Sequence, residues 1–315
     1  MIHLSSQGLD LFCVRTLVLT PFKASVTRIP RTGKSGTPGA TKIAFEFHGS
    51  EEKMAEFIFM IAGGMLAGLL GSVLGLGGGI LIIPMLTLVF GVPMREAIGA
   101  SLVCVIATSS GAASLYVRRR LCDIRLGMTL ELATTLGAVA GGVIAGMLKP
   151  QILSVLFSIV LLYTAWTMLP KKDDIRNARD SGDGEPSYKT TRLPLGMGAS
   201  FFAGNVSGLL GVGGGIVKVP VMYMIMRVPL KTAIATSNFM IGVTASAGAF
   251  VYFSRGEVHP LVAGSTMLGV FVGATLGSRL LPRIRAEYLK KAFVFVLLYL
   301  SLEMLFRGLG FHLLF

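Results

Sequence analysis

Long apolar stretches separated by short polar connections make up most of the chain after residue 54. They form two groups of five, at about 55–74, 78–92, 96–117, 124–148 and 151–169, and at about 193–210, 214–228, 232–253, 258–281 and 288–307. A helix needs about 20 apolar residues to cross the roughly 30 Å core of a bilayer. The pattern predicts an all-α polytopic membrane protein. The first two, shorter stretches of each group are either two thin spans or one broken or re-entrant pair.

The two groups are copies of one unit. A shift of 136 positions aligns residues 75–80 with residues 211–216 and gives roughly thirty identities over about a hundred positions. The same shift pairs Pro84 with Pro220 and places a second proline pair, at 93 and 229, in register. We therefore predict two structural repeats of five segments each.

Charges in the connections indicate how the repeats are oriented. An odd number of crossings per repeat requires inversion of the second repeat, and cytoplasmic connections carry an excess of Lys and Arg. The connection at 118–125 is strongly basic, whereas its counterpart at 255–259 is nearly neutral. Lys149 is the one cation of its connection, whereas the counterpart at 279–291 has five. This exchange predicts inverted repeats with a cytoplasmic linker and both ends of the membrane domain outside.

The composition agrees with a membrane protein and excludes several classes. Only 14% of the residues are charged, against about 25% in soluble domains. The net charge of +13 comes from basic connections without an RNA or DNA motif, so we expect no nucleic-acid partner. Three cysteines without paired spacing and four scattered histidines predict no metal site. We also expect no cofactor and no enzymatic activity, because no convergent catalytic set is visible.

Glycine triplets separate the first two stretches of each repeat. Such backbone is a poor helix interior, and inside a bilayer it persists only where protein or a water-filled cavity satisfies it. An interruption placed alike in both halves is typical of a transporter's substrate site, where N–H groups at a helix start can face an anion. The alternative is that the glycines only permit close helix packing. The candidate binding positions are Gly75, Gly77, Gly78, Gly79, Gly211, Gly213, Gly214 and Gly215.

Lys218 follows the second triplet, where the first repeat has Ile82. A cation inside an apolar segment is costly, so it either faces a cavity or partner or extends to the membrane surface. Hydroxyl and amide side chains that could complete an anion site are Ser101, Thr108, Asn205, Ser237, Asn238 and Thr244, although such groups often bond to helix carbonyls instead. Glu131 is either a proton-coupling group or a solvated or paired carboxylate, and we favour the second.

Domain boundaries follow from the polar stretches. Residues 1–53 read as a disordered or non-native N-terminal extension: a transit peptide or, as we favour, a segment upstream of a true start at Met54. Residues 54–170 form membrane repeat 1, residues 171–192 the linker, and residues 193–315 membrane repeat 2.

The paired GxGGGxxxxP motifs and the stretches from Pro93 to Ser101 and from Pro229 to Ser237 resemble those of the TauE/SafE family of sulfite exporters. The resemblance covers about residues 56–310 and implies transport of small sulfur-containing anions across the plasma membrane, with the motif glycines along the substrate path. We therefore expect a multi-pass secondary transporter in the cell membrane whose partners are a small anion and the lipid bilayer. The same features also fit an anion channel.

Overall fold

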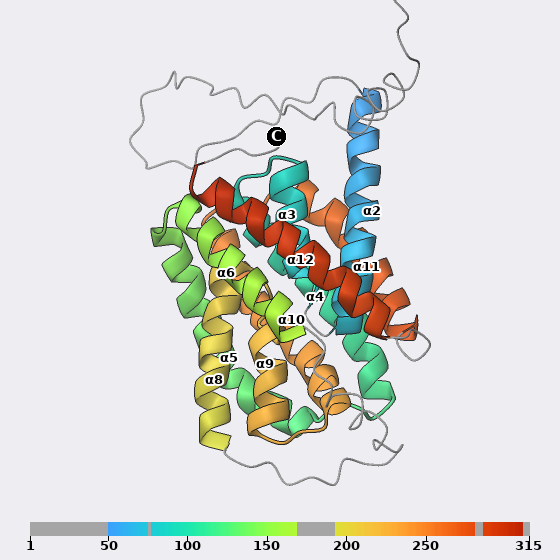
Figure 1. Cartoon of the computed structure of the whole chain (residues 1–315), viewed down its shortest axis with the longest axis vertical. Helices are drawn as coiled ribbons and strands as arrows, with labels where there is room; N and C mark the ends of the chain where they lie inside the picture. Colours follow the sequence, from blue (N-terminus) through green and yellow to red (C-terminus); the bar gives the residue numbers. More distant parts are fainter. Residues whose placement is uncertain (1–49, 75–76, 169–192, 281–285, 311–315) are drawn as a thin grey trace, which may run out of the picture.

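The computed structural model describes residues 50–74, 77–168, 193–280 and 286–310 (Figure 1). Most of the predicted N-terminal extension, Gly75 and the linker lie outside these residues. Every regular element in the described part of the chain is a helix. In chain order these are α2 (Ser50–Leu74), α3 (Gly79–Pro84), η1 (Met85–Val89), α4 (Met94–Arg118), α5 (Ile124–Met147), α6 (Pro150–Met168), α8 (Leu193–Leu210), α9 (Gly215–Pro220), η2 (Val221–Ile225), α10 (Leu230–Ser254), α11 (Pro260–Leu280) and α12 (Ala286–Gly308).

Seven helices in the described ranges are long and apolar enough to cross a membrane: α2, α4, α5, α6, α8, α10 and α11. The predicted all-α polytopic membrane protein is therefore confirmed. The second stretch of each group is different. Its six residues of α-helix and five of π-helix extend only roughly 16 Å, about half of a hydrocarbon core.

Prolines explain why the short helices change character. Pro84 ends α3 and Pro220 ends α9, and a π-helical segment follows each of them. A proline inside a helix has no N–H to donate, and its ring pushes away the carbonyl of the preceding turn, so the hydrogen-bond ladder must shift. Pro93 and Pro229 act differently. They stand in extended conformation directly before α4 and α10, where a missing N–H has no cost.

Each short helix folds back along the helix before it. A side chain at Gly71 would collide with the backbone of Gly78, and one at Gly63, two turns earlier in α2, would collide with Met85. Earlier residues of α2 thus contact later residues of the α3–η1 segment, so the two run antiparallel and form a hairpin. In the second half, Gly214 packs against Ala203 of α8 in the same way. The glycine triplet is therefore the turn of a helical hairpin.

The first long helix of each half packs against the third long helix of the other half. Helix α2 packs against α11, and α8 packs against α5. Glycines make both approaches close: Gly68 lies on the carbonyl of Val270, and its repeat counterpart Gly204 lies on the carbonyl of Thr134. The glycines at 269, 273 and 277 pack on α2, as expected for a packing face.

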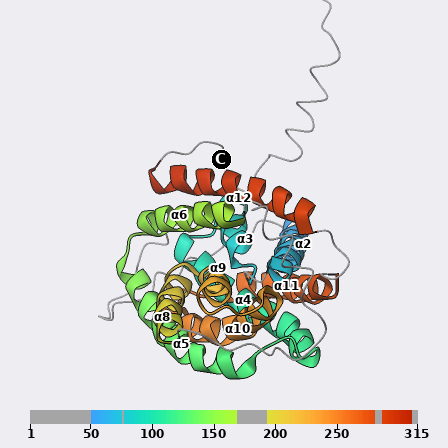
Figure 2. The same ribbon diagram turned by 60° about the horizontal axis from the view of Figure 1, so that its bottom comes forward.

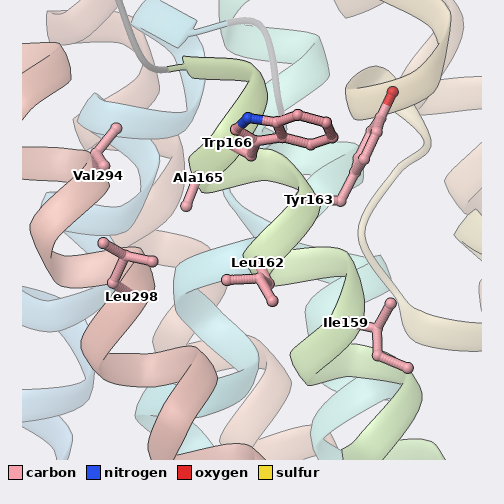
Figure 3. A pocket seen from close by; sticks show the side chains of 7 residues that line it. All are labelled: Ile159, Leu162, Tyr163, Ala165, Trp166, Val294 and Leu298. Carbon is pink, nitrogen blue, oxygen red and sulfur yellow. The ribbon is translucent and has the colours of Figure 1, made fainter.

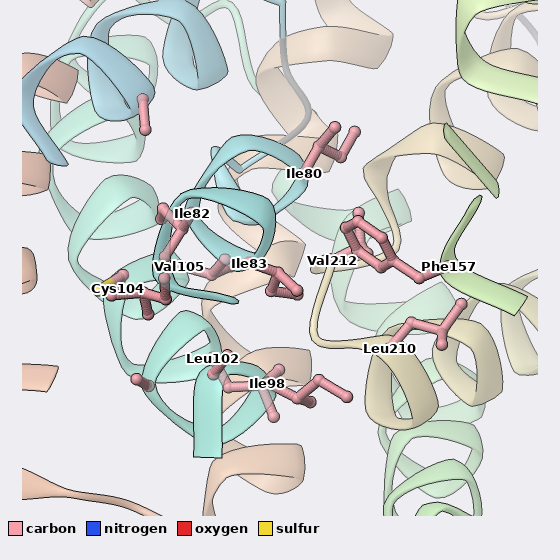
Figure 4. Packing of buried hydrophobic residues seen from close by; sticks show 14 of the residues in the cluster. Ile80, Ile82, Ile83, Ile98, Leu102, Cys104, Val105, Phe157, Leu210 and Val212 are labelled. Carbon is pink, nitrogen blue, oxygen red and sulfur yellow. The ribbon is translucent and has the colours of Figure 1, made fainter. Parts of the chain in front are cut away.

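Helices α4 and α10 pack against each other at the centre, and α6 pairs with α12. Figure 2 shows α6 and α12 side by side as a separate layer along one side of the remaining helices. The apolar core continues from α3 to the second half. Figure 4 shows Ile82 and Ile83 of α3 beside Val105 of α4, with Val212 and Phe157 across from them. Both glycine turns thus lie within the buried interior.

Candidate functional site

The two glycine turns meet at one point in the interior. A side chain at Gly77 would begin 3.2 Å from Ile241 Cγ2 and 3.3 Å from Val105 Cγ1. A side chain at Gly213 would begin 2.8 and 2.9 Å from the same two atoms. Val105 and Ile241 are themselves repeat counterparts, on α4 and α10. The two interrupted segments therefore converge around a pair of equivalent apolar side chains.

Left-handed backbone makes glycine necessary in these turns. Gly77 and Gly78 have φ values of 78° and 75°, and Gly213 and Gly214 have 79° and 76°. Side chains raise the energy of this conformation by about 1–2 kcal/mol per residue. Gly211 is also left-handed, at 70°. The triplets are thus turn residues whose lack of a side chain also lets two chain segments approach.

Ser101 connects one turn to the other. Its hydroxyl donates a hydrogen bond of 2.9 Å to the carbonyl of Gly211. Gly79 lies against this bond, since a side chain there would begin 2.5 Å from the Gly211 oxygen and 2.9 Å from Ser101 Oγ. The predicted polar position at 101 therefore serves first as a contact between the halves.

Lys218 forms the charged centre of the site. Only 1% of its surface is exposed, and its Nζ donates to Thr244 Oγ1 at 2.7 Å. The Thr244 hydroxyl lies 2.6 Å from Glu131 Oε1, and Lys218 Nζ lies 3.5 Å from Glu131 Oε2. Thr135 donates to the same carboxylate at 3.3 Å. Lys218 therefore has a buried partner and does not extend to the membrane surface.

Glu131 is the residue that the sequence prediction left out of the site. We favoured a solvated or paired carboxylate, and Glu131 is paired. Its partner could not be inferred, because the two residues are 87 positions apart. Helix α5 delivers Glu131 to Lys218 through the close α5–α8 and α5–α10 packing. The signal available in the sequence was an acid within an apolar segment.

Some buried polar atoms of the second half are unsatisfied. In the described residues, Ser207 Oγ, Ser237 Oγ and Asn238 Oδ1 are buried without a hydrogen-bond partner. Ser207 lies at the turn, because a side chain at Gly214 would begin 3.3 Å from Ser207 Cβ. Buried polar groups are normally paired, so such atoms mark a place where a ligand or water can bind.

The remaining predicted positions differ in their placement. Thr108 lies near the first turn, 3.6 Å from where a side chain at Gly78 would begin, and donates to the carbonyl of Cys104. The side-chain amide of Asn238 donates to the carbonyl of Ile234. Asn205 is half-buried, and its backbone packs against the glycines of α5. A role for Asn205 in binding stays a prediction.

The described ranges hold no cluster of metal ligands, and the groove between α6 and α12 is lined by apolar side chains. No three His, Cys, Asp or Glu side chains lie there in a group that could hold a metal ion. A groove of about 470 Å³ lies between α6 and α12, and Figure 3 shows its lining. Five aliphatic and two aromatic side chains form it: Ile159, Leu162, Ala165, Val294, Leu298, Tyr163 and Trp166. It has no charged group that could bind an anion.

Comparison with known proteins identifies the family. The model of the sulfite exporter TauE/SafE family matches residues 60–304, which include both glycine turns and the Lys218–Glu131 pair. The chain belongs to the TauE/SafE family. The predicted resemblance is thereby confirmed, and with it a membrane transporter that crosses the bilayer several times.

Relatives of this TauE/SafE protein carry the same general description. The probable membrane transporter protein YunE of Bacillus subtilis is 27% identical over 270 residues, which cover 80% of this chain and 98% of YunE. A probable membrane transporter protein of Methanocaldococcus jannaschii is 26% identical, over 79% of this chain and 93% of the relative. No solved structure shows a significant match. These names describe membrane transporters, and they specify no substrate.

Proposed function

We propose that the protein is a secondary transporter of small sulfur-containing anions, of the sulfite, sulfoacetate or organosulfonate class, across the cell membrane. The observation that carries the proposal is Lys218, a buried cation on α9, the short helix that follows the second glycine turn. A buried charge is retained at such cost where it binds something, and a lysine ammonium is a compact donor for an oxyanion.

Backbone and hydroxyl donors support an anion next to Lys218. The first helical hydrogen bonds of α9 run from the N–H groups of Val217 and Lys218 to the carbonyl of Gly214. The N–H groups of Gly215 and Ile216 precede them and have no helical acceptor, as at any helix start. Together with the unpaired hydroxyls of Ser207 and Ser237, they would replace the hydration shell of the anion.

Transport requires that the site open to each side in turn. We propose that the two repeats are inverted in the membrane and exchange access by rocking about the two glycine turns. The reciprocal packing of α2 on α11 and of α8 on α5 supports this proposal, as does the exchange of basic connections. No nucleotide-binding motif is present in the sequence, so an ion or substrate gradient would supply the energy.

Uptake into proteoliposomes tests the proposal. Purified protein should transport at least one of radiolabelled sulfite, thiosulfate, sulfoacetate and taurine against empty-vesicle controls. Lys218→Met should reduce the initial rate at least about tenfold, the effect of losing roughly 1.4 kcal/mol of binding. Lys149→Met is the matched control, because it removes an exposed cation outside the site and should transport normally.

Two outcomes would overturn this function. Absence of flux for every sulfur anion would remove the transport claim. Single-channel currents at rates far above those of carriers would show that the protein is an anion channel, the alternative that uses the same lining groups.

A further inference from the structure

Glu131 is paired with Lys218, the cation that a substrate anion would need. Its two carboxylate oxygens lie 2.6 Å from Thr244 Oγ1 and 3.5 Å from Lys218 Nζ. Lys218 and Thr244 are the cation and the hydroxyl that best suit an oxyanion at the second turn. The carboxylate therefore makes, from within the protein, the contacts that we assign to the transported anion.

Glu131 and Lys218 balance each other's charge in the buried interior. The side chains of Glu131 and Lys218 are 6% and 1% exposed, and their opposite charges cancel. Helix α8 carries no titratable residue, and the titratable side chains described on the other packed elements are Arg125 on α5, Tyr223 on η2, and Tyr252 and the adjoining Arg255 on α10. None of these is hydrogen-bonded or ion-paired to Glu131 or Lys218 in the described residues. An anion that entered beside Lys218 would leave the buried site with one uncompensated negative charge, which is strongly unfavourable.

We propose that Glu131 is an internal competitor of the substrate, and that binding of the anion is coupled to uptake of one proton by Glu131. The anion displaces the carboxylate from Lys218 and Thr244. The released carboxylate takes one proton from water and becomes a neutral carboxylic acid, so the site keeps its net charge of zero for a monovalent anion. When the anion leaves, Glu131 loses the proton and pairs with Lys218 again.

This inference rests on the proposed function and adds the coupled ion to it. It makes the carrier a proton–anion symporter for a monovalent substrate, and the same cycle runs in either direction according to the gradients. Thr135, which also donates to Glu131 Oε1, stays with the carboxyl group one helix turn away and can orient it in either state.

Proton uptake by the purified wild-type protein tests the inference directly. Isethionate, sulfoacetate or thiosulfate is added to the detergent-solubilised protein in weak buffer with a pH indicator, because these anions keep their charge near neutral pH. The proton count is made with isethionate, the monovalent anion of the three, and we expect uptake of about one proton for each isethionate bound. The apparent Kd should rise by up to about tenfold per pH unit on the alkaline side, because binding consumes a proton.

Variants assign the proton to Glu131. Glu131→Gln should bind the same anion without proton uptake and with an affinity that is independent of pH. Glu303→Gln is the matched control, because Glu303 is the other acid within an apolar segment and lies on α12. This control should take up protons as the wild type does.

The outcomes separate this inference from the proposed function. Anion binding by the wild type without proton uptake overturns the inference and leaves the transporter in place. Proton uptake that persists in a folded Glu131→Gln protein overturns the assignment to this residue. If none of the anions binds to wild type or variant, the proposed function fails and the inference fails with it. Should the Gln variant not fold, the wild-type measurement still decides.

Discussion

The two glycine turns have the same backbone and different chemistry. Gly77 and Gly213 differ by 1° in φ, and both lie against Val105 and Ile241. Lys218, Thr244 and Glu131 stand together after the second turn, whereas their repeat counterparts are Ile82, Thr108 and Met267. Ile82 is fully buried in apolar surroundings, and Thr108 bonds only to its own helix.

This difference separates a requirement of the fold from a requirement of binding. Both turns need left-handed residues without side chains, because both hairpins must reverse and approach each other. The proposed function needs only one cation, because the turns meet at a single place and would share it. A second lysine at position 82 would add a buried charge without a carboxylate to balance it, at a cost of several kcal/mol.

The largest effect is expected from breaking the charge pair of Lys218 and Glu131. Glu131→Leu should lower the free energy of unfolding by about 3–5 kcal/mol, because Lys218 would stay buried and unpaired. Met267→Leu, at the repeat counterpart of Glu131, should change it by less than about 1.5 kcal/mol. Thermal unfolding in detergent measures both.

A double variant sharpens this test. Glu131→Leu combined with Lys218→Met should recover most of the lost stability, since two apolar side chains of similar size replace the pair. Failure of the second change to restore stability would show that the loss arises from packing of α5 and not from the charge on Lys218.

The glycine turns should differ in how they tolerate a methyl group. Alanine at Gly77 or Gly213 costs about 1–2 kcal/mol for the left-handed backbone. At Gly213 the methyl carbon would also lie only 2.8 Å from Ile241 and 2.9 Å from Val105, against 3.2 and 3.3 Å at Gly77. This overlap adds about 1–3 kcal/mol. Gly213→Ala should therefore unfold at a lower temperature than Gly77→Ala, and equal midpoints would contradict the closer packing of the second turn.

Sequence patterns predicted the helices well because each one has local signals. The stretch predicted at 96–117 is a helix at Met94–Arg118, and Pro93 stands directly before it. The glycine triplets and the prolines behind them likewise have local meaning and indicated the hairpin turns. The pairing of Lys218 with Glu131 and of Ser101 with Gly211 depends on which helices meet. Separations of 87 and 110 residues leave no periodic signal for such contacts.

Ser101 and its counterpart Ser237 should respond in different ways to alanine. Ser101→Ala leaves the buried carbonyl of Gly211 without its donor, at a cost of about 1–3 kcal/mol of stability. The hydroxyl of Ser237 has no partner among the described residues, so Ser237→Ala should be neutral or slightly stabilising. Its effect should appear in transport, with an apparent KM raised about tenfold by the loss of a hydrogen bond to a charged ligand. A stability loss at Ser237 equal to that at Ser101 would indicate a structural role for both.

The smallest perturbation tests whether the two repeats are inverted. Arg118 and Ser254 are repeat counterparts, exposed at the last residues of α4 and α10. In a chain whose native cysteines are replaced, Arg118→Cys and Ser254→Cys should change stability by less than about 0.5 kcal/mol. A membrane-impermeant maleimide should label residue 254 in intact cells and residue 118 only after permeabilisation, because inverted repeats place equivalent connections on opposite sides.

Labelling of both from one side would mean that the repeats are parallel. The two turns would then approach the centre from the same face, and a shared site reached from each side in turn would lose its structural basis.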